Sequence, residues 1–138
     1  MKPDFQNIEI GDKLPVLELA PLSRLTLALY CGASGDHNPI HVDSDYARDV
    51  AGLPDVIGHG SLIMAYLGRL LTNWVPQRCV QRFKTRFTSH ARIGDVISCI
   101  GMVVEKSSGK EGTIRVELQA VNQAGTVLAT GEATIVEC

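Results

Sequence analysis

Four stretches in the last sixty residues of this 138-residue chain are rich in apolar and β-branched residues. They span 79–88, 96–105, 113–120 and 127–136, and turn residues separate them at 93–95, 107–112 and 122–125. Apolar and polar residues alternate in the third stretch, where Ile114, Val116 and Leu118 would face one side. The pattern predicts consecutive antiparallel strands whose apolar face needs a cover.

The segment 61–74 is the natural cover for this face, because it is apolar on nearly every side of a helix. Its apolar residues are Leu62, Ile63, Met64, Ala65, Leu67, Leu70, Leu71 and Trp74. Ser61 is expected to cap this helix, and Val75 followed by Pro76 is expected to end it. We therefore predict an α+β fold with an antiparallel sheet wrapped around one long central helix.

Shorter elements are expected in the first half of the chain. Residues 13–20 predict a strand, with Pro15 near its start marking an edge or an irregular beginning. Residues 24–31 predict a helix that Ser23 caps and Gly32 closes, with Leu25, Ala28 and Leu29 on one face. Residues 42–51 predict another helix, capped by Asp43 or Ser44 and stopped by Gly52. Without repeats or low-complexity linkers, the chain is expected to form a single domain over 1–138.

The segment 34–41 (Ser-Gly-Asp-His-Asn-Pro-Ile-His) concentrates the candidate chemistry. Pro39 is incompatible with an ordinary helix and pushes Asn38 towards an extended conformation, so a turn is expected here. Such a turn can bring Asp36 and His41 to flank one small volume. A carboxylate and an imidazole that face the same water can perform general acid–base chemistry near neutral pH. The alternative is a hydrogen-bonded turn with no catalytic role.

A second candidate lies where the sequence Gly58-His59-Gly60 enters the central helix. The backbone N–H groups at Gly60 and just beyond would lie at the positive end of the helix dipole. Such a helix terminus can stabilise a developing oxyanion. The alternative is that both glycines only allow a tight entry into the helix. His37 and His59 flank this site, and we expect both to be bystanders.

These motifs together resemble a known family. Residues 30–41 (Tyr-Cys-Gly-Ala-Ser-Gly-Asp-His-Asn-Pro-Ile-His) are similar to the signature of the MaoC-like, R-specific enoyl-CoA hydratases, also called hydratase 2. The similarity continues through 58–62 and, more weakly, through 87–95. The resemblance implies the hot-dog fold, with about five strands. It also implies that Asp36 and His41 are the catalytic pair and that the Gly60 N–H polarises the thioester carbonyl.

Two further residues of the motif are less clearly assigned. Asn38 either orients the pair or the substrate, or only holds the Asn-Pro turn. Ser61 would lie in the substrate-binding region, but it departs from the family pattern, in which a bulky apolar residue is commoner. This departure would leave the acid–base pair untouched and alter the shape of the acyl pocket.

The resemblance implies reversible addition of water to a trans-2-enoyl thioester, a hydro-lyase reaction of fatty acid metabolism. The substrate carrier would be coenzyme A or acyl carrier protein, and no redox cofactor is needed because the thioester supplies its own activation. A 3-hydroxyacyl-ACP dehydratase subunit, a hot-dog acyl-CoA thioesterase and a non-catalytic acyl-binding partner subunit are the alternatives. The family is usually dimeric, so a homodimer is expected.

A metal site is the main chemical competitor. Asp36, His37, His41 and His59 could supply ligands, but no HxxxH pattern on a helix and no cysteine pair completes a zinc shell. We therefore expect no metal.

Composition excludes several other classes of protein. The net charge of −2 gives no indication of nucleic-acid binding, and no run of about 20 apolar residues is present to span a membrane. The four cysteines form no CxxC motif, which favours free thiols in a reducing compartment. The first residues lack the apolar core of a signal peptide, so we expect a cytoplasmic protein.

One charged pattern remains, in the segment 78–92. Its basic residues Arg78, Arg82, Lys84, Arg86 and Arg92 are all even-numbered and would share one face of a regular strand. Phe83 and Phe87 would face the central helix. The basic face would attract the phosphates of coenzyme A or of an acyl carrier protein, or it is simply a solvated surface.

Overall fold

The structure is a computed structural model that describes residues 3–109 and 112–138. The helices are α1 (Arg24–Ser34), α2 (Ser44–Asp49) and α3 (Gly60–Trp74), with 3-10 turns at Pro39–His41 and Gln77–Cys79. The strands are β1 (Leu17–Glu18), β2 (Val80–Phe87), β3 (Ser98–Ser107), β4 (Thr113–Val121) and β5 (Val127–Val136).

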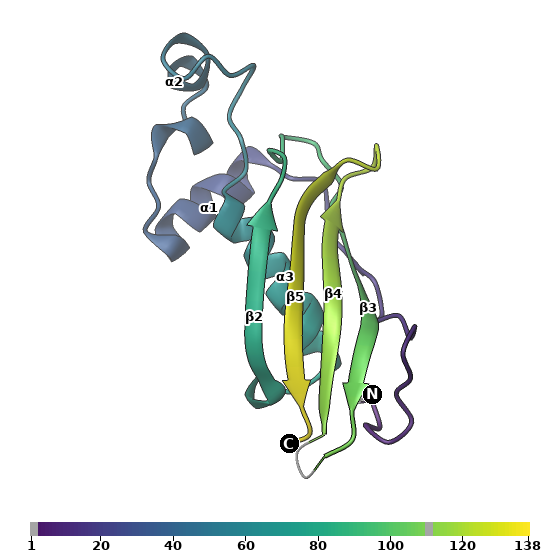
Figure 1. Ribbon diagram of the computed structural model, residues 1–138. Coiled ribbons are helices and arrows are strands. Elements are labelled where there is room, and N and C mark those ends of the chain that lie inside the picture. The colour runs from purple at the N-terminus through teal and green to yellow at the C-terminus, as the bar shows by residue number, and fades with distance from the viewer. Residues whose placement is uncertain (1–2, 110–111) are drawn as a thin grey trace.

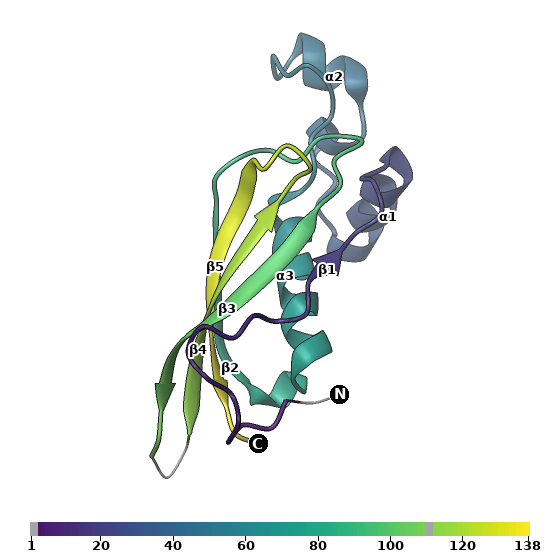
Figure 2. The same ribbon diagram turned by 90° about the vertical axis from the view of Figure 1, so that its right-hand side faces the viewer.

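The five strands form one sheet in the order β1-β3-β4-β5-β2, and every neighbouring pair is antiparallel. The sheet curls, and α3 lies against its inner face, while α1 and α2 lie at one end of the domain (Figures 1 and 2). The predicted α+β hot-dog fold is confirmed. Of the turn predicted at 107–112, residues 110 and 111 lie outside the described residues.

The core forms between α3 and the inner face of the sheet. Helix α3 buries Leu62, Ile63, Leu67, Leu70, Leu71 and Trp74. The alternating residues of β4, Ile114, Val116 and Leu118, are at most 2% exposed and meet them from the sheet. Burial of one such side chain stabilises the fold by roughly 1.5–3 kcal/mol. The prediction that the helix covers the apolar face is therefore correct.

The ends of α3 differ in how well the sequence predicts them. Val75 ends the helix as predicted, but the capping residue is His59, and Ser61 lies inside the first turn. Ser61 as the cap is therefore wrong. No side chain caps the helix in the described structure, so its first backbone N–H groups have no side-chain acceptor.

Helix α1 begins as predicted, since the Ser23 side chain accepts a hydrogen bond from the Thr26 N–H. It continues past Gly32 and ends only at Gly35, which adopts the left-handed conformation at φ 75°. Gly32 as the stop is wrong, because glycine inside a helix is a modest cost and not a barrier. The buried side chains are Leu27 and Cys31, whereas the face of Leu25, Ala28 and Leu29 is exposed.

Two other predicted elements are shorter in the structure. The strand predicted at 13–20 is reduced to Leu17–Glu18 and one isolated bridge from Lys13 to Met102, because Pro15 interrupts the pairing. The helix predicted at 42–51 is reduced to α2, whose cap is Asp43, while Gly52 follows with a positive φ. None of the helices among the described residues has the length and apolar character needed to cross a membrane.

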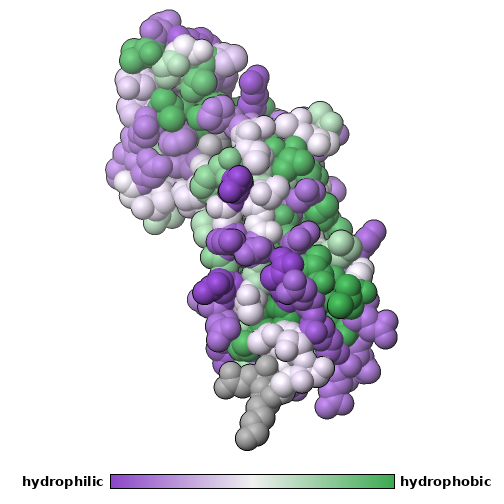
Figure 3. All heavy atoms as spheres, viewed as in Figure 1, coloured by the Kyte–Doolittle hydropathy of each residue, from purple (hydrophilic) through white to green (hydrophobic). Residues whose placement is uncertain are grey.

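The basic segment 78–92 is not one regular strand. Arg78 lies in a 3-10 turn, a register shift separates Val80 from Arg82, and Arg92 lies beyond the strand. Arg82, Lys84 and Arg86 do share the outer face of β2, where Lys84 pairs with Glu132 at 3.0 Å. Figure 3 shows hydrophilic side chains across this outer face, with apolar groups gathering towards β3, where Ile100 and Met102 are exposed.

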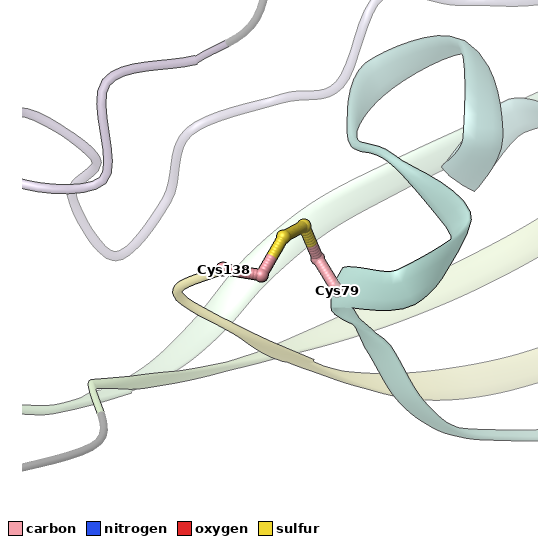
Figure 4. The surroundings of a disulfide bond; sticks show 2 residues. All are labelled: Cys79 and Cys138. Atoms are coloured by element: carbon pink, nitrogen blue, oxygen red, sulfur yellow. A yellow bond between two sulfur atoms is a disulfide. The ribbon is translucent and has the colours of Figure 1, made fainter.

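A disulfide joins Cys79, at the end of the second 3-10 turn, to Cys138 (Figure 4). The expectation of free thiols is therefore wrong for these two cysteines, while Cys31 and Cys99 are free and buried. The pairing could not be read from spacing, because 59 positions separate the two residues. Disulfides are uncommon in reducing compartments, so the cytoplasmic location loses this support and stays a prediction.

We expect Cys138→Ser to lower the free energy of unfolding of the oxidised protein by about 2–4 kcal/mol. The physical reason is that the bond restricts the unfolded chain. Denaturant unfolding with and without reductant measures this. Reductant should destabilise the wild type and leave the variant unchanged. Equal stability of the two oxidised proteins would contradict the prediction.

Candidate active site

The loop after α1 is folded tightly by its own side chains. The Asp36 N–H donates to Ser34 Oγ at 3.1 Å, and the Asn38 N–H donates to Asp36 Oδ1 at 3.2 Å. Asn38 Oδ1 in turn accepts from the Ile40 N–H at 3.2 Å and caps the 3-10 turn that Pro39 opens. Asn38 therefore holds the Asn-Pro turn, one of the two roles considered for it.

The turn brings Asp36 and His41 together. His41 Nε2 lies 3.7 Å from Asp36 Oδ2, and the carboxylate side chain is 47% exposed, whereas that of His41 is 8% exposed. At this separation the two groups do not bond directly, but both can contact one water molecule that enters from solvent. The predicted proximity of these two side chains is present in the structure.

The His41 ring has a defined tautomer. Its Nδ1 lies 2.7 Å from the Ile57 carbonyl oxygen, which can only accept, so Nδ1 carries the proton. Nε2 of the neutral ring then presents a lone pair on the side of Asp36. The Ile57 N–H donates to the Ile40 carbonyl at 3.1 Å, so the segment before α3 and the loop before His41 are tied together.

His59 lies directly against this pair, although we expected it to be a bystander. Its ring stacks on His41, with ring centroids 3.7 Å apart and ring planes at 19°. Burial, followed by the proximity of His41, lowers the pKa of His59 below its usual value. The position of His59, immediately before Gly60 at the start of a buried helix, is the feature of the sequence that could have indicated these contacts. The other expected bystander, His37, is exposed.

The entry to α3 is shaped by two glycines. A methyl group at Gly58 would lie 3.1 Å from Ala91 Cβ and 3.2 Å from Leu22, so the close approach of this segment favours glycine. At Gly60 a methyl group would make an ordinary 3.4 Å contact with the Phe87 ring. Phe87 lies on the helix side of β2, as predicted, but is 53% exposed. Gly60 directly follows His59, whose ring contacts both Asp36 and His41.

The surrounding loop is held by ionic contacts away from the pair. Arg24, at the start of α1, bonds Asp55 at 2.6 Å, and Ser44 of α2 donates to the same carboxylate at 2.9 Å. These contacts, led by Arg24, hold the pKa of Asp55 well below its usual range. Asp55 therefore stays ionised and links both helices to the chain that leads into α3.

Asp36, His41 and His59 each offer a possible metal ligand, and these atoms lie within 4.8 Å of one another. Imidazole lone pairs lie in the ring plane, so two stacked rings direct theirs side by side and not at one point. This arrangement does not fit the tetrahedral geometry of zinc.

The structure places Ser61 on the exposed side of the first turn of α3.

The curled antiparallel sheet wrapped around the buried helix α3 defines a hot-dog domain. The chain belongs to the MaoC-like domain family, which it matches over residues 4–124.

Named relatives agree with this assignment. The chain is 29% identical over 137 residues to the (R)-specific enoyl-CoA hydratase of Rhodospirillum rubrum, covering 95% of this chain and 89% of the relative. It is 27% identical to the fatty acid synthase subunit beta of Saccharomyces cerevisiae over 94% of this chain, but it spans only 6% of that protein. The solved R-hydratase PhaJ1 from Pseudomonas aeruginosa superimposes with a TM-score of 0.81 at 28% identity, covering 95% of this chain and 83% of that one.

Proposed function

We propose that this protein is an R-specific enoyl-CoA hydratase, which reversibly adds water to a trans-2-enoyl thioester to give a (3R)-3-hydroxyacyl thioester. The observation that carries the proposal is the 3.7 Å approach of His41 Nε2 to Asp36 Oδ2, with both residues in contact with His59, the N-cap residue of α3. Membership of the MaoC-like domain family and the names of its relatives support the reaction class.

In this proposal Asp36 and His41 hold the reacting water between them. The water oxygen attacks Cβ of the enoyl group while one of its protons passes to the pair. The pair returns one proton to Cα, so its protonation state is the same before and after the reaction. The Asp36 carboxylate is partly exposed and reaches solvent. The buried His41 ring is held by the Ile57 carbonyl.

Attack at Cβ places negative charge on the thioester oxygen, and the Gly60 N–H is the group proposed to receive it. A helix N-terminus suits this role because its N–H groups and its dipole both favour an anion. No described residue caps this end with a side chain, so the donor needs no prior rearrangement. Ser61 and Asn38 would contact the substrate at the edges of the site.

The basic face of β2 is proposed to attract the phosphates of the substrate carrier. Arg82 and Arg86 are exposed there on both sides of Lys84. Coenzyme A and acyl carrier protein both present phosphate, so initial rates with matched enoyl substrates on each carrier distinguish them. A higher rate with acyl carrier protein would favour a dehydratase of fatty acid synthesis, in keeping with the fatty acid synthase relative.

We further propose that two copies of this 14.9 kDa chain form a homodimer. Strand β2 is the last strand of the sheet, so one of its edges has no partner among the described strands. Exposed apolar side chains also occur at Phe87 of β2 and at Leu25 and Leu29 of α1. Pairing of two β2 edges would cover both features.

Asp36→Asn and His41→Ala should each lower the rate of crotonyl-CoA hydration by about 10²–10⁴-fold, because each removes one acid–base partner. The loss of enoyl-thioester absorbance measures this rate. The matched control is His37→Ala, which removes an exposed imidazole from the same loop and should keep the wild-type rate. Equal rates in all four proteins would reject the proposal, and release of free thiol from saturated acyl-CoA would favour a thioesterase.

Gly60→Pro should lower kcat by about 10²–10³-fold, because proline has no N–H to stabilise the oxyanion. Proline is tolerated at the first helical position, which Gly60 occupies, so the helix should still form. Gly60→Ala is the matched control, since it keeps the N–H and makes only an ordinary contact with Phe87. Equal kcat values for the proline and alanine variants would remove Gly60 from the mechanism.

Sedimentation equilibrium of the wild type should give about twice the mass of the 14.9 kDa chain at micromolar concentration. The physical reason is that an unpaired edge and apolar side chains beside it are unfavourable in water. A protein that stays monomeric up to the concentrations used in the assay would contradict the homodimer.

A further inference from the structure

His59 is 1% exposed and therefore one of the most buried polar side chains among the described residues. Burying an imidazole is costly unless its contacts compensate, so its surroundings need an explanation. Four groups face it: Tyr30 and Cys31 from α1, Asp36 from the loop, and His41 from the 3-10 turn.

The first contact fixes the backbone of Asp36. His59 Nε2 lies 3.3 Å from the Asp36 carbonyl oxygen. A carbonyl oxygen only accepts hydrogen bonds, so Nε2 must carry the proton and donate it. The Cys31 sulfur lies 3.5 Å from the same nitrogen and can share that proton. The bond joins the residue before α3 to the residue that carries the proposed catalytic carboxylate.

The second contact fixes the ring of His41. The stack at 3.7 Å places the flat face of His59 against it, while the Ile57 carbonyl holds its Nδ1. These two contacts restrict both rotation and tilt of the His41 ring. Tyr30 packs edge-on against His59, at 4.8 Å between ring centroids and 73° between planes, and keeps His59 in place.

We propose that His59 is the positioning residue of the acid–base pair, whose Nε2–H holds the Asp36 backbone and whose ring face holds the His41 imidazole. This inference rests on the proposed hydratase function. With 1% exposure, His59 has almost no surface with which to touch substrate, so it acts through its two neighbours.

The proposal requires opposite tautomers in two adjacent histidines. His41 carries its proton on Nδ1 and His59 carries its proton on Nε2, because each faces a carbonyl oxygen at that atom. His59 Nδ1 is then a bare lone pair, and this buried atom has no hydrogen-bond partner among the described residues. A second proton on His59 would be buried and would lie against His41, and both effects lower its pKa.

The first experiment uses the wild-type protein and does not depend on activity. Long-range ¹H–¹⁵N spectra of the four histidine rings report the tautomer and charge of each. His59, assigned from the missing signals of His59→Gln, should be the Nε2–H tautomer and should be half-protonated below the usual pKa of 6.5. An Nδ1–H tautomer, or half-protonation at or above pH 6.5, would overturn the proposal.

The second experiment separates the two contacts by kinetics. His59→Phe keeps an aromatic ring for the stack but has no N–H, and His59→Gln keeps a donor but has no ring. Each variant should lower kcat by about tenfold or more with KM within about twofold, a smaller loss than removal of an acid–base partner. A wild-type kcat in either variant would overturn the proposal, because the contact removed in that variant would then have no part in positioning Asp36 or His41.

Matched controls distinguish positioning from a general loss of structure. His37→Phe and His37→Gln make the same changes at an exposed histidine and should keep the wild-type kcat. Circular dichroism spectra check that the His59 variants are folded. If the wild type fails to hydrate any enoyl thioester, the proposed function fails, while the spectra still decide whether His59 holds the two groups.

Discussion

The burial of α3 in the curled sheet is the constraint on which the rest of the structure depends. The apolar residues of α3 are shielded from water only when they pack inside the curled sheet, and this packing fixes how the helix is oriented. The start of the helix meets the loop that carries Asp36 and His41. Because Gly58 approaches Ala91 and Leu22 without a side chain, this entry can be tight. Core packing therefore ties the start of the helix to the loop that carries Asp36 and His41.

Buried polar groups tie the site to this core. His41 bonds the Ile57 carbonyl, and Asp95, also buried, accepts from the Arg92 N–H at 2.9 Å. The bridge between Ile57 and Arg92 links these two bonds across the entry to α3. Among the described residues, His59 Nδ1 and Thr85 Oγ1 are buried side-chain atoms without a hydrogen-bond partner. Such an unpaired buried atom needs an explanation, and the proposed positioning role of His59 supplies one.

Local chemistry explains what could be predicted from the sequence. The alternation in β4 and the apolar run of α3 led to the correct layers, because burial imposes periods that can be read along the chain. Pro39 excluded an ordinary α-helix between Asp36 and His41, so the turn that brings them together was also predictable. Predictions failed where a local rule has exceptions, as at Gly32 inside α1 and at Ser61 inside α3.

The sequence by itself determined the four strands of the second half of the chain, the central helix and the proline turn, since each depends on residues close together along the chain. Only the tertiary structure decided which face of α1 is buried and that His59 stacks on His41. It also decided that Cys79 bonds Cys138, across 59 positions. These contacts join residues far apart in sequence, and periodicity carries no information about which distant residue will lie opposite. The proximity of Asp36 and His41 could be predicted from the sequence, but the contacts that hold them in place could not.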